Sequence, residues 1–176
     1  MHADGSLKLD YDYALEGSFL YHGISFDHPE KEMTSLRWLG AGPYRVWQNR
    51  LEGTWLGVHE IARADSQPGN TWGYPEFQGM FAGLRWAQLK TTSEALTVTS
   101  ASTDLYLRVG TPRINHQFTT VEFPAGDISF LHAIPGIGSK FILPDKSGPS
   151  GQPAQAHGHY HGSLIFSLGE PQTIRD

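Results

Sequence analysis

The stretch Leu36–Gly57, LRWLGAGPYRVWQNRLEGTWLG, carries the pattern from which the fold of the chain is predicted. A short apolar run ends at Leu39, the glycines and proline of GAGP follow at 40–43, and a second apolar run begins at Thr54. Glycine and proline at this density interrupt regular structure. The pattern predicts a strand, an exposed and elaborated loop, and a second strand.

Between the two apolar runs, aromatic rings are interleaved with cations and amides. The residues concerned are Tyr44, Arg45, Trp47, Gln48, Asn49 and Arg50. The apolar faces of sugars stack on aromatic rings, and sugar hydroxyls take directional hydrogen bonds from amide and guanidinium groups. The loop therefore suits carbohydrate recognition. The alternative is a β-sandwich corner that is held together by its own aromatic side chains.

Alternation of apolar and polar residues predicts strands along most of the chain. It is clearest at Leu7–Leu15, where every second residue is apolar or aromatic. Gly 20 and Pro 11 in 176 residues indicate many turns. We expect one all-β domain over 1–176, a mostly antiparallel β-sandwich of roughly ten short strands with essentially no helix. The other predicted strands are Phe19–Phe26, Leu36–Leu39, Thr54–Ile61, Gly83–Lys90, Leu96–Thr99 and Leu105–Val109 as a hairpin, Asp127–Ile134, Gly138–Leu143 and Ser163–Leu168.

Composition argues against several classes of function. The net charge is −5, from 13 basic and 18 acidic residues, and no basic run exists, which disfavours a nucleic-acid partner. Cysteine is absent, so we expect no disulfide framework and no thiolate metal site. No apolar stretch is long enough for a membrane span. The segment 1–10 lacks the apolar core of a signal peptide, and both bacterial cytoplasm and periplasm remain open as locations.

The segment LGAGP at 39–43, continuing to Arg50, resembles the LGxGPxENYxDR signature of a known domain. That domain is the C-terminal β-sandwich (small chain or domain 5) of glycoside hydrolase family 2 β-galactosidases. The turn and the terminal arginine are retained, but the acidic pair is not, so no role of those acids is carried over. The departures are Arg45 for Glu, Val46 for Asn, Trp47 for Tyr and Asn49 for Asp.

Weaker matches extend this resemblance from about Leu7 to Leu168. They are Tyr-Pro-Glu at 74–76 followed by Arg-Trp at 85–86, Pro-Gly-Ile-Gly at 135–138, and the last strand at 163–168. The resemblance implies part of a galactose-mutarotase-like supersandwich. It also implies a non-catalytic domain without a cofactor, since the family's two catalytic glutamates lie on a separate barrel. The implied partners are a galactoside-like carbohydrate and a catalytic barrel domain or subunit, or a second copy in a homodimer.

In such enzymes an aromatic residue after the Gly-Ile-Gly turn stacks on the sugar at the mouth of the barrel. Phe141 is the nearest aromatic at the matching place, although it also fits a core strand position. Further aromatic candidates lie beside turn residues. The predicted carbohydrate-binding set is Tyr44, Arg45, Trp47, Trp72, Tyr74, Glu76 and Phe141.

Other titratable residues support alternatives. The HGHYH run places His157, His159 and His161 on one face of a strand, but no carboxylate or cysteine neighbours them in sequence, so we expect exposed or structural histidines and no metal site. A mutarotase-like epimerase would need a His acid and a Glu base, available as His59, His132, Glu60 and Glu76. His59 and Glu60 are adjacent in a strand and point to opposite faces, which weakens this alternative.

A third alternative is a purely structural interaction module. Retaining glycoside hydrolysis needs two carboxyl groups about 5 Å apart. No two acids near turns or loops can be paired from sequence, so we expect no hydrolysis by the chain alone. These acids are Glu52, Glu60, Asp65, Glu76, Asp104 and Asp127.

Overall fold

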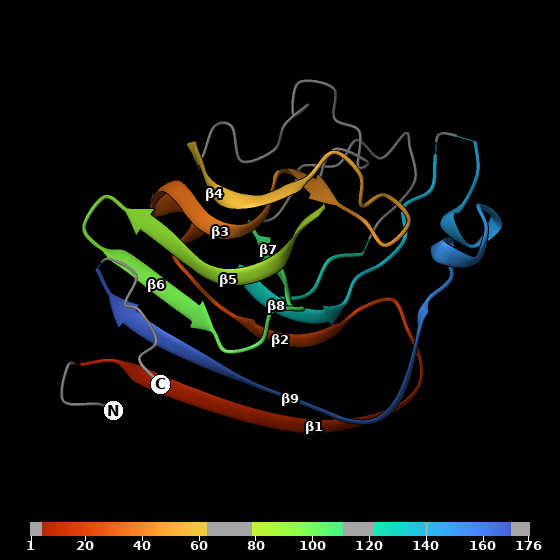
Figure 1. Ribbon diagram of the computed structural model, residues 1–176, viewed down its shortest axis with the longest axis horizontal. Helices are drawn as coiled ribbons and strands as arrows, with labels where there is room; N and C mark the ends of the chain where they lie inside the picture. The colour runs from red at the N-terminus through yellow and green to blue at the C-terminus, as the bar shows by residue number, and fades with distance from the viewer. Residues whose placement is uncertain (1–4, 63–78, 111–121, 140, 170–176) are drawn as a thin grey trace.

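The computed structural model of the chain describes residues 5–62, 79–110, 122–139 and 141–169. Within these ranges every strand pair is antiparallel, and helical structure is limited to three short 3-10 turns, η1 (Glu30–Glu32), η5 (Pro144–Lys146) and η6 (Pro149–Gly151). The predicted all-β, antiparallel fold is confirmed (Figure 1). The strands are β1 (Leu7–Phe19), β2 (His22–Phe26), β3 (Met33–Val46), β4 (Trp55–Ala62), β5 (Met80–Thr91), β6 (Ala95–Ser100), β7 (Tyr106–Val109), β8 (Ile128–Ala133) and β9 (Ala154–Leu168).

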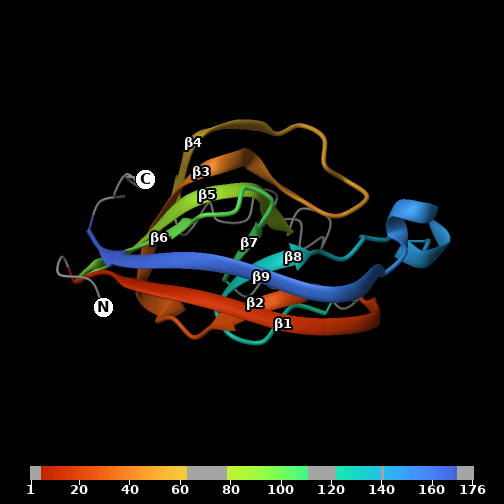
Figure 2. The same cartoon turned by 60° about the horizontal axis from the view of Figure 1, so that its bottom comes forward.

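The strands form two layers that share β5. One layer has the order β1-β9-β6-β5-β3-β4, and the other has the order β2-β8-β7-β5. Figures 1 and 2 show β1 and β9 running side by side along one side of the molecule, with β3 and β4 on the other. The core lies between the layers, where inward-facing apolar side chains from both layers form a buried cluster.

One edge of β5 changes its partner, and with it the layer, at Gly83, while the other edge pairs with β3 on both sides of this residue. Before this residue, Phe81 pairs with Leu107 of β7, and after it, Trp86 pairs with Thr99 of β6. Gly83 has φ +61°, in the left-handed region that favours glycine. The bend therefore depends on a backbone conformation that other residues adopt only at a cost.

The first strand of the stretch Leu36–Gly57 is longer than predicted. We expected it to end at Leu39, but β3 continues to Val46. A Cβ atom at Gly42 would lie 2.7 Å from ring atoms of both Trp38 and His59. Glycine there makes room for two packed rings inside a continuing strand, so in this stretch it does not mark the end of regular structure.

Two other strand predictions are wrong in detail. Leu96–Thr99 and Leu105–Val109 do not form a hairpin with each other, because β6 pairs with β5 and β9 while β7 pairs with β5 and β8. The described part of Gly138–Leu143 is a turn, in which the main-chain nitrogen of Ser139 donates to the oxygen of Ile142 at 2.8 Å. Period-2 patterns predict strands but carry no information on which strands become neighbours.

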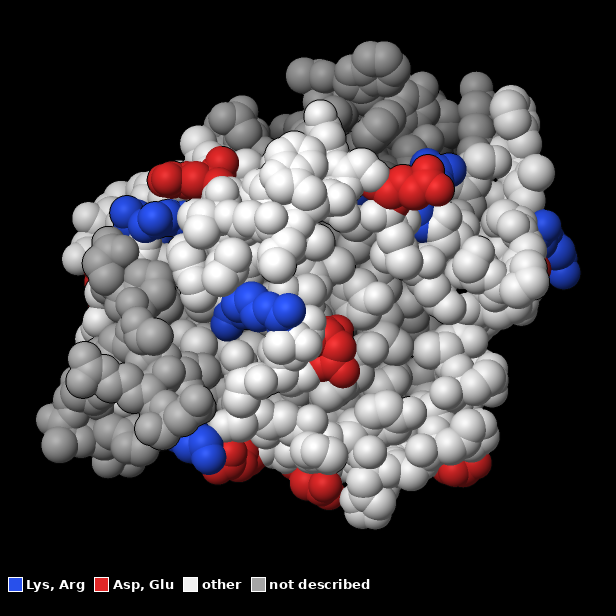
Figure 3. Space-filling model, viewed as in Figure 1, with Lys and Arg blue, Asp and Glu red and all other residues white. Residues whose placement is uncertain are grey.

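Charged side chains are scattered over the face of the molecule shown in Figure 3. On the face shown in Figure 3, lysine and arginine side chains occur singly or in small groups, interspersed with acidic ones, and no broad basic area is visible. Among the residues described, no helix has the length and apolar character needed to cross a bilayer.

The bend in β5 yields the first prediction. Gly83→Ala should lower the free energy of unfolding by about 1–2 kcal/mol, from backbone strain alone, because the nearest atoms to the new Cβ lie 3.9 Å away. Gly57→Ala in β4 is the matched control. Its Cβ would also find ordinary contacts, at 3.4 Å or more, without a positive φ, so we expect a change within about 0.5 kcal/mol. Urea denaturation measures both, and equal effects would contradict the proposed role of Gly83.

Candidate functional site

The loop between β3 and β4, residues 47–54, is fastened to the segment that follows β8. The side-chain nitrogen of Asn49 donates to the oxygen of Ile137 at 2.9 Å, and the nitrogen of Ile137 donates to the side-chain oxygen of Asn49 at 2.8 Å. The main-chain nitrogen of Gln48 adds a bond to the oxygen of Pro135 at 3.0 Å. Asn49 thus satisfies both main-chain groups of one residue and fixes the loop against the Pro-Gly-Ile-Gly turn.

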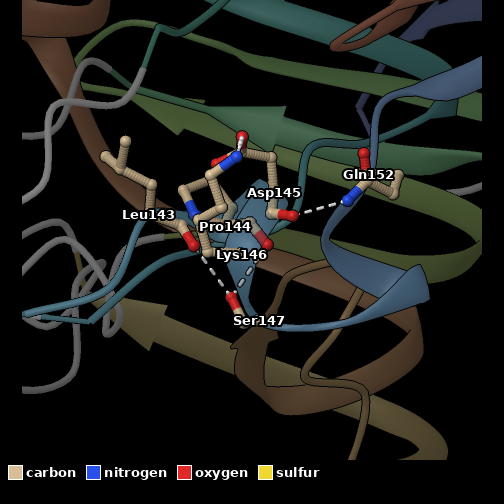
Figure 4. Close-up of polar contacts among 6 residues, drawn as sticks. All are labelled: Leu143, Pro144, Asp145, Lys146, Ser147 and Gln152. Carbon is tan, nitrogen blue, oxygen red and sulfur yellow. Dashed lines mark hydrogen bonds and ion pairs between the residues drawn. The ribbon is translucent and has the colours of Figure 1, made fainter.

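The chain after this turn is also internally bonded, through η5 and η6. Figure 4 shows the hydroxyl of Ser147 donating to the oxygens of Leu143 (3.1 Å) and Pro144 (2.8 Å). The amide nitrogen of Gln152 donates to the oxygen of Asp145 at 2.6 Å. The segment 143–152 therefore has a defined local structure.

A pocket of about 540 Å³ lies between the loop and this segment. Its lining offers guanidinium, carboxylate and hydroxyl groups, which can both donate and accept hydrogen bonds, while the amide of Asn49 is already bonded to Ile137. The lining residues are Gln48, Asn49, Arg50, Leu51, Glu52 and Ser150. Such a set suits a neutral, polyhydroxylated ligand.

Two of the predicted aromatic candidates are at the surface. Tyr44, near the end of β3, is 54% exposed, and its ring lies 3.8 Å from the Cβ position that a side chain at Gly53 would have. Phe141 is 86% exposed. The core-strand alternative for Phe141 does not hold, because the ring lies outside both hydrophobic clusters.

Trp47 and Arg45 are part of the packing. Trp47 is fully buried with Met80, Leu131 and other apolar side chains, so its ring has no face for a sugar, and its prediction as a sugar contact is corrected. Arg45 donates to the oxygens of Gly79 (3.0 Å) and Val109 (3.4 Å). Its guanidinium also lies over the ring of Phe81 at 4.7 Å.

Burial, with a further contribution from the neighbouring Arg108, lowers the pKa of Arg45 to about 10, which leaves the side chain charged at neutral pH. Its hydrogen bonds run to main-chain oxygens, which is a structural role. Three further candidates, Trp72, Tyr74 and Glu76, lie outside the described residues.

Two of the acids considered from the sequence, Asp104 and Asp127, have local hydrogen-bond partners. Asp127 accepts a hydrogen bond from the main-chain nitrogen of His28 at 2.9 Å, and Asp104 accepts one from the hydroxyl of Ser102. The bond from Ser102 is the largest cause that lowers the pKa of Asp104. Asp65 lies outside the described residues. These contacts account for Asp104 and Asp127 without a catalytic role.

The positions of His59 and Glu60 do not support the mutarotase alternative. His59 is buried, and its Nε2 lies 3.1 Å from the oxygen of Trp55. Glu60 is exposed on the opposite side of β4, as expected for adjacent strand residues. The two side chains therefore cannot act on one substrate from these positions.

The histidines of the HGHYH run lie on the outer face of β9 beside carboxylates of β1. His157 Nδ1 is 2.7 Å from Glu16, and His159 Nδ1 is 3.0 Å from Asp12. Sequence analysis missed these partners because they come from a strand more than a hundred residues earlier. Among the residues described, no group of three or more His, Cys, Asp or Glu side chains could hold a metal ion.

On the inner face of the same strands lies a ring cluster that sequence analysis did not identify. Tyr11 bonds His132 Nε2 at 3.0 Å, and Tyr13 bonds His22 Nδ1 at 3.0 Å. Tyr160 completes the cluster, with its ring centroid 4.4 Å from that of His22. The sequence pattern predicts only part of this cluster. Period 2 places Tyr11 and Tyr13 on the inward face of the strand but does not identify the histidines that they contact.

The fastening of the loop gives a second prediction. Asn49→Ala should lower the free energy of unfolding by about 1–3 kcal/mol, because the nitrogen and oxygen of Ile137 both lose their partner. Gln155→Ala is the control, since its side chain bonds Ser18 in an exposed position and should change stability by less than about 0.5 kcal/mol. Chemical denaturation of both variants tests this, and a neutral Asn49→Ala would contradict it.

The ring cluster predicts how stability depends on pH. Burial lowers the pKa of His22 and of His132, so the unfolded chain binds more protons than the folded chain below the ordinary histidine value of about 6.5. Folding stability should be full above this pH and should decrease as the pH falls below it. Urea midpoints at about pH 7.5 and about pH 5.5 measure the decrease.

The double variant His22→Asn/His132→Asn is the control for this titration. It should show a smaller decrease, with part remaining because burial also lowers the pKa of His28. The surface pairs of His157 and His159 are present in both proteins and cancel in the comparison. An unchanged pH dependence would show that the cluster is not the source.

The chain was compared with protein-family models and with curated proteins. No protein-family model matches the chain, and no curated protein matches it. Function is therefore proposed from the sequence motifs together with residue chemistry and geometry.

Proposed function

We propose that the chain is a non-catalytic, carbohydrate-associated β-sandwich domain of a β-galactosidase-like glycoside hydrolase of family 2. In this role, the edge formed by loop 47–54 and by residues 138–139 and 141–152 contacts a galactoside-like sugar at the mouth of a catalytic barrel. The barrel belongs to another domain or subunit. A homodimer is the alternative assembly.

The observation that carries this proposal is the pair of hydrogen bonds between Asn49 and Ile137. These residues are 88 positions apart, and Asn49 lies in the stretch from Leu39 to Arg50 while Ile137 lies in the Pro-Gly-Ile-Gly turn, two of the matches that carry the resemblance. The bonds bring both motifs to one edge of the molecule. Such a juxtaposition is what a jointly built binding surface requires, and it supports a shared role for the two motifs.

Phe141 provides the aromatic face for this edge. The two residues that follow it, Ile142 and Leu143, are 49% and 59% exposed. The tip of this turn, residues 141–143, is therefore apolar over three successive residues. Burying one such side chain stabilises a fold by about 1.5–3 kcal/mol, and the exposed side chains of the tip do not contribute this stabilisation. Contiguous exposed apolar groups of this kind mark surfaces that meet a ligand or a partner.

The tip is also held in place. The hydroxyl of Ser139 accepts hydrogen bonds from the main-chain nitrogens of Phe141 (3.3 Å) and Ile142 (3.2 Å). A pre-formed turn reduces the entropy lost when a sugar stacks on the ring. The polar pocket at Gln48–Glu52 and Ser150 supplies hydrogen-bonding groups at the same edge.

The role of Phe141 can be tested by NMR titration of the chain with methyl β-galactoside. We expect saturable shifts at residues 48–52 and 139–143. Phe141→Ala should weaken binding roughly two- to tenfold, since a ring contact contributes about 0.5–1.5 kcal/mol beyond its buried area. Leu168→Ala is the matched control, because Leu168 is a similarly exposed apolar residue, at 72%, at the end of β9.

Two outcomes would count against the proposal. One is saturable binding that maps away from both segments. The other is equal affinity in Phe141→Ala and the native chain. In either case the exposed tip would have another purpose.

A further inference from the structure

A second pocket opens between β1 and β2, near the turn that joins them. Its volume is about 250 Å³. Rings and aliphatic side chains make up most of its lining: Tyr13, Leu15, Phe19, Tyr21, His22 and Leu131. It shares no lining residue with the pocket beside loop 47–54, so it is a separate feature.

One polar pair faces this apolar lining. The hydroxyl of Tyr13 and Nδ1 of His22 are 3.0 Å apart, and the side chain of His22 is buried. Whichever tautomer His22 adopts, its two nitrogens are complementary: one donates and the other accepts. The imidazole can therefore offer either a donor or an acceptor to a ligand.

The pair is fixed from behind by other rings. Tyr160 stacks on Tyr13 with ring centroids 5.7 Å apart, and it meets His22 edge-on at 4.4 Å. His132 stacks parallel to His22 at 6.1 Å. These contacts from β8 and β9 hold the polar pair in one orientation, which lowers the entropic cost of binding.

The pocket is uncharged at neutral pH. Its lining includes no carboxylate, ammonium or guanidinium group. Burial lowers the pKa of the His22 imidazole and raises that of the Tyr13 phenol, so both side chains stay neutral. A charged ligand would lose its hydration here without gaining a counter-charge.

We propose that this pocket binds a small, uncharged, planar aromatic molecule that carries one hydrogen-bonding group, of the phenol or indole type. Aromatic walls favour a planar ring, and the Tyr13–His22 pair provides the polar contact. An engineered apolar cavity of about 150 Å³ accommodates benzene. The larger pocket here fits one substituted ring or two fused rings.

A sugar suits this pocket less well than an aromatic ring. Its several hydroxyls would need several partners, and the hydroxyl of Ser25, also in the lining, already bonds that of Ser129 at 2.9 Å. The inference is thus independent of the proposed carbohydrate role.

NMR titration of the native chain with phenol, indole, toluene and benzoate tests the proposal. Phenol and indole should give saturable shifts centred on residues 19–25, and benzoate should bind at least about tenfold more weakly because its charge is unpaired in the pocket. His22→Phe should weaken phenol binding roughly two- to tenfold and leave toluene binding unchanged, since toluene lacks the hydrogen-bonding group.

A pocket-filling variant provides the positional test. Leu15→Trp should abolish indole binding, whereas Leu9→Trp, on the same face of β1 but outside the pocket, should retain it. The amide spectrum of each variant verifies folding. The comparison of phenol with benzoate in the native chain decides the matter even if a variant does not fold.

Three results would overturn the inference. They are no saturable shift with phenol or indole, equal affinity for benzoate and phenol, and unchanged indole binding in a folded Leu15→Trp variant.

Discussion

The membership of β5 in both layers is the constraint on which the rest of the structure depends. Its first part pairs with β7 and its second part with β6, and the change occurs at the left-handed backbone of Gly83. Because the two layers are joined through one covalent strand, their separation at this end is fixed by the chain itself. The core side chains, including Trp38 and Phe81 with ring centroids 4.2 Å apart, fill the space that this bend creates.

At the opposite side, no strand is shared among the described residues, and the layers meet through side chains and through the turn that joins β1 to β2. β1 pairs with β9 and β2 pairs with β8, and hydrogen bonds of Tyr11 with His132 and of Tyr13 with His22 join the two layers there. Ring contacts are less demanding of spacing than a backbone ladder, in which neighbouring strands lie about 4.8 Å apart. This difference explains why a pocket opens beside β1 and β2, while the side joined by β5 is closely packed.

Sequence reasoning predicts the local features of this fold and not the long-range ones. The alternation at Leu7–Leu15 predicts β1 because period 2 is a property of the strand itself. Tyr44 and Trp47 are aromatic residues in the same polar stretch after the GAGP segment, and the sequence does not distinguish their positions. In the structure, Tyr44 is 54% exposed and Trp47 is fully buried. The difference arises from residues such as Leu131 and Ile137, which pack on Trp47 from a distant part of the chain. The same limit applies to Tyr11 and His132, which are 121 positions apart.

The pairing of β1 with β9 has a consequence for how the protein is made. Leu7 is paired with Phe166, so the edge of β1 that bonds β9 must wait until the last described strand has been synthesised. Contacts between such distant residues carry a high loop-closure cost and slow the search for the native state. During translation, β1 therefore emerges as an unpaired strand, and its inward Tyr11 and Tyr13 are exposed to other nascent chains and to chaperones until β9 leaves the ribosome.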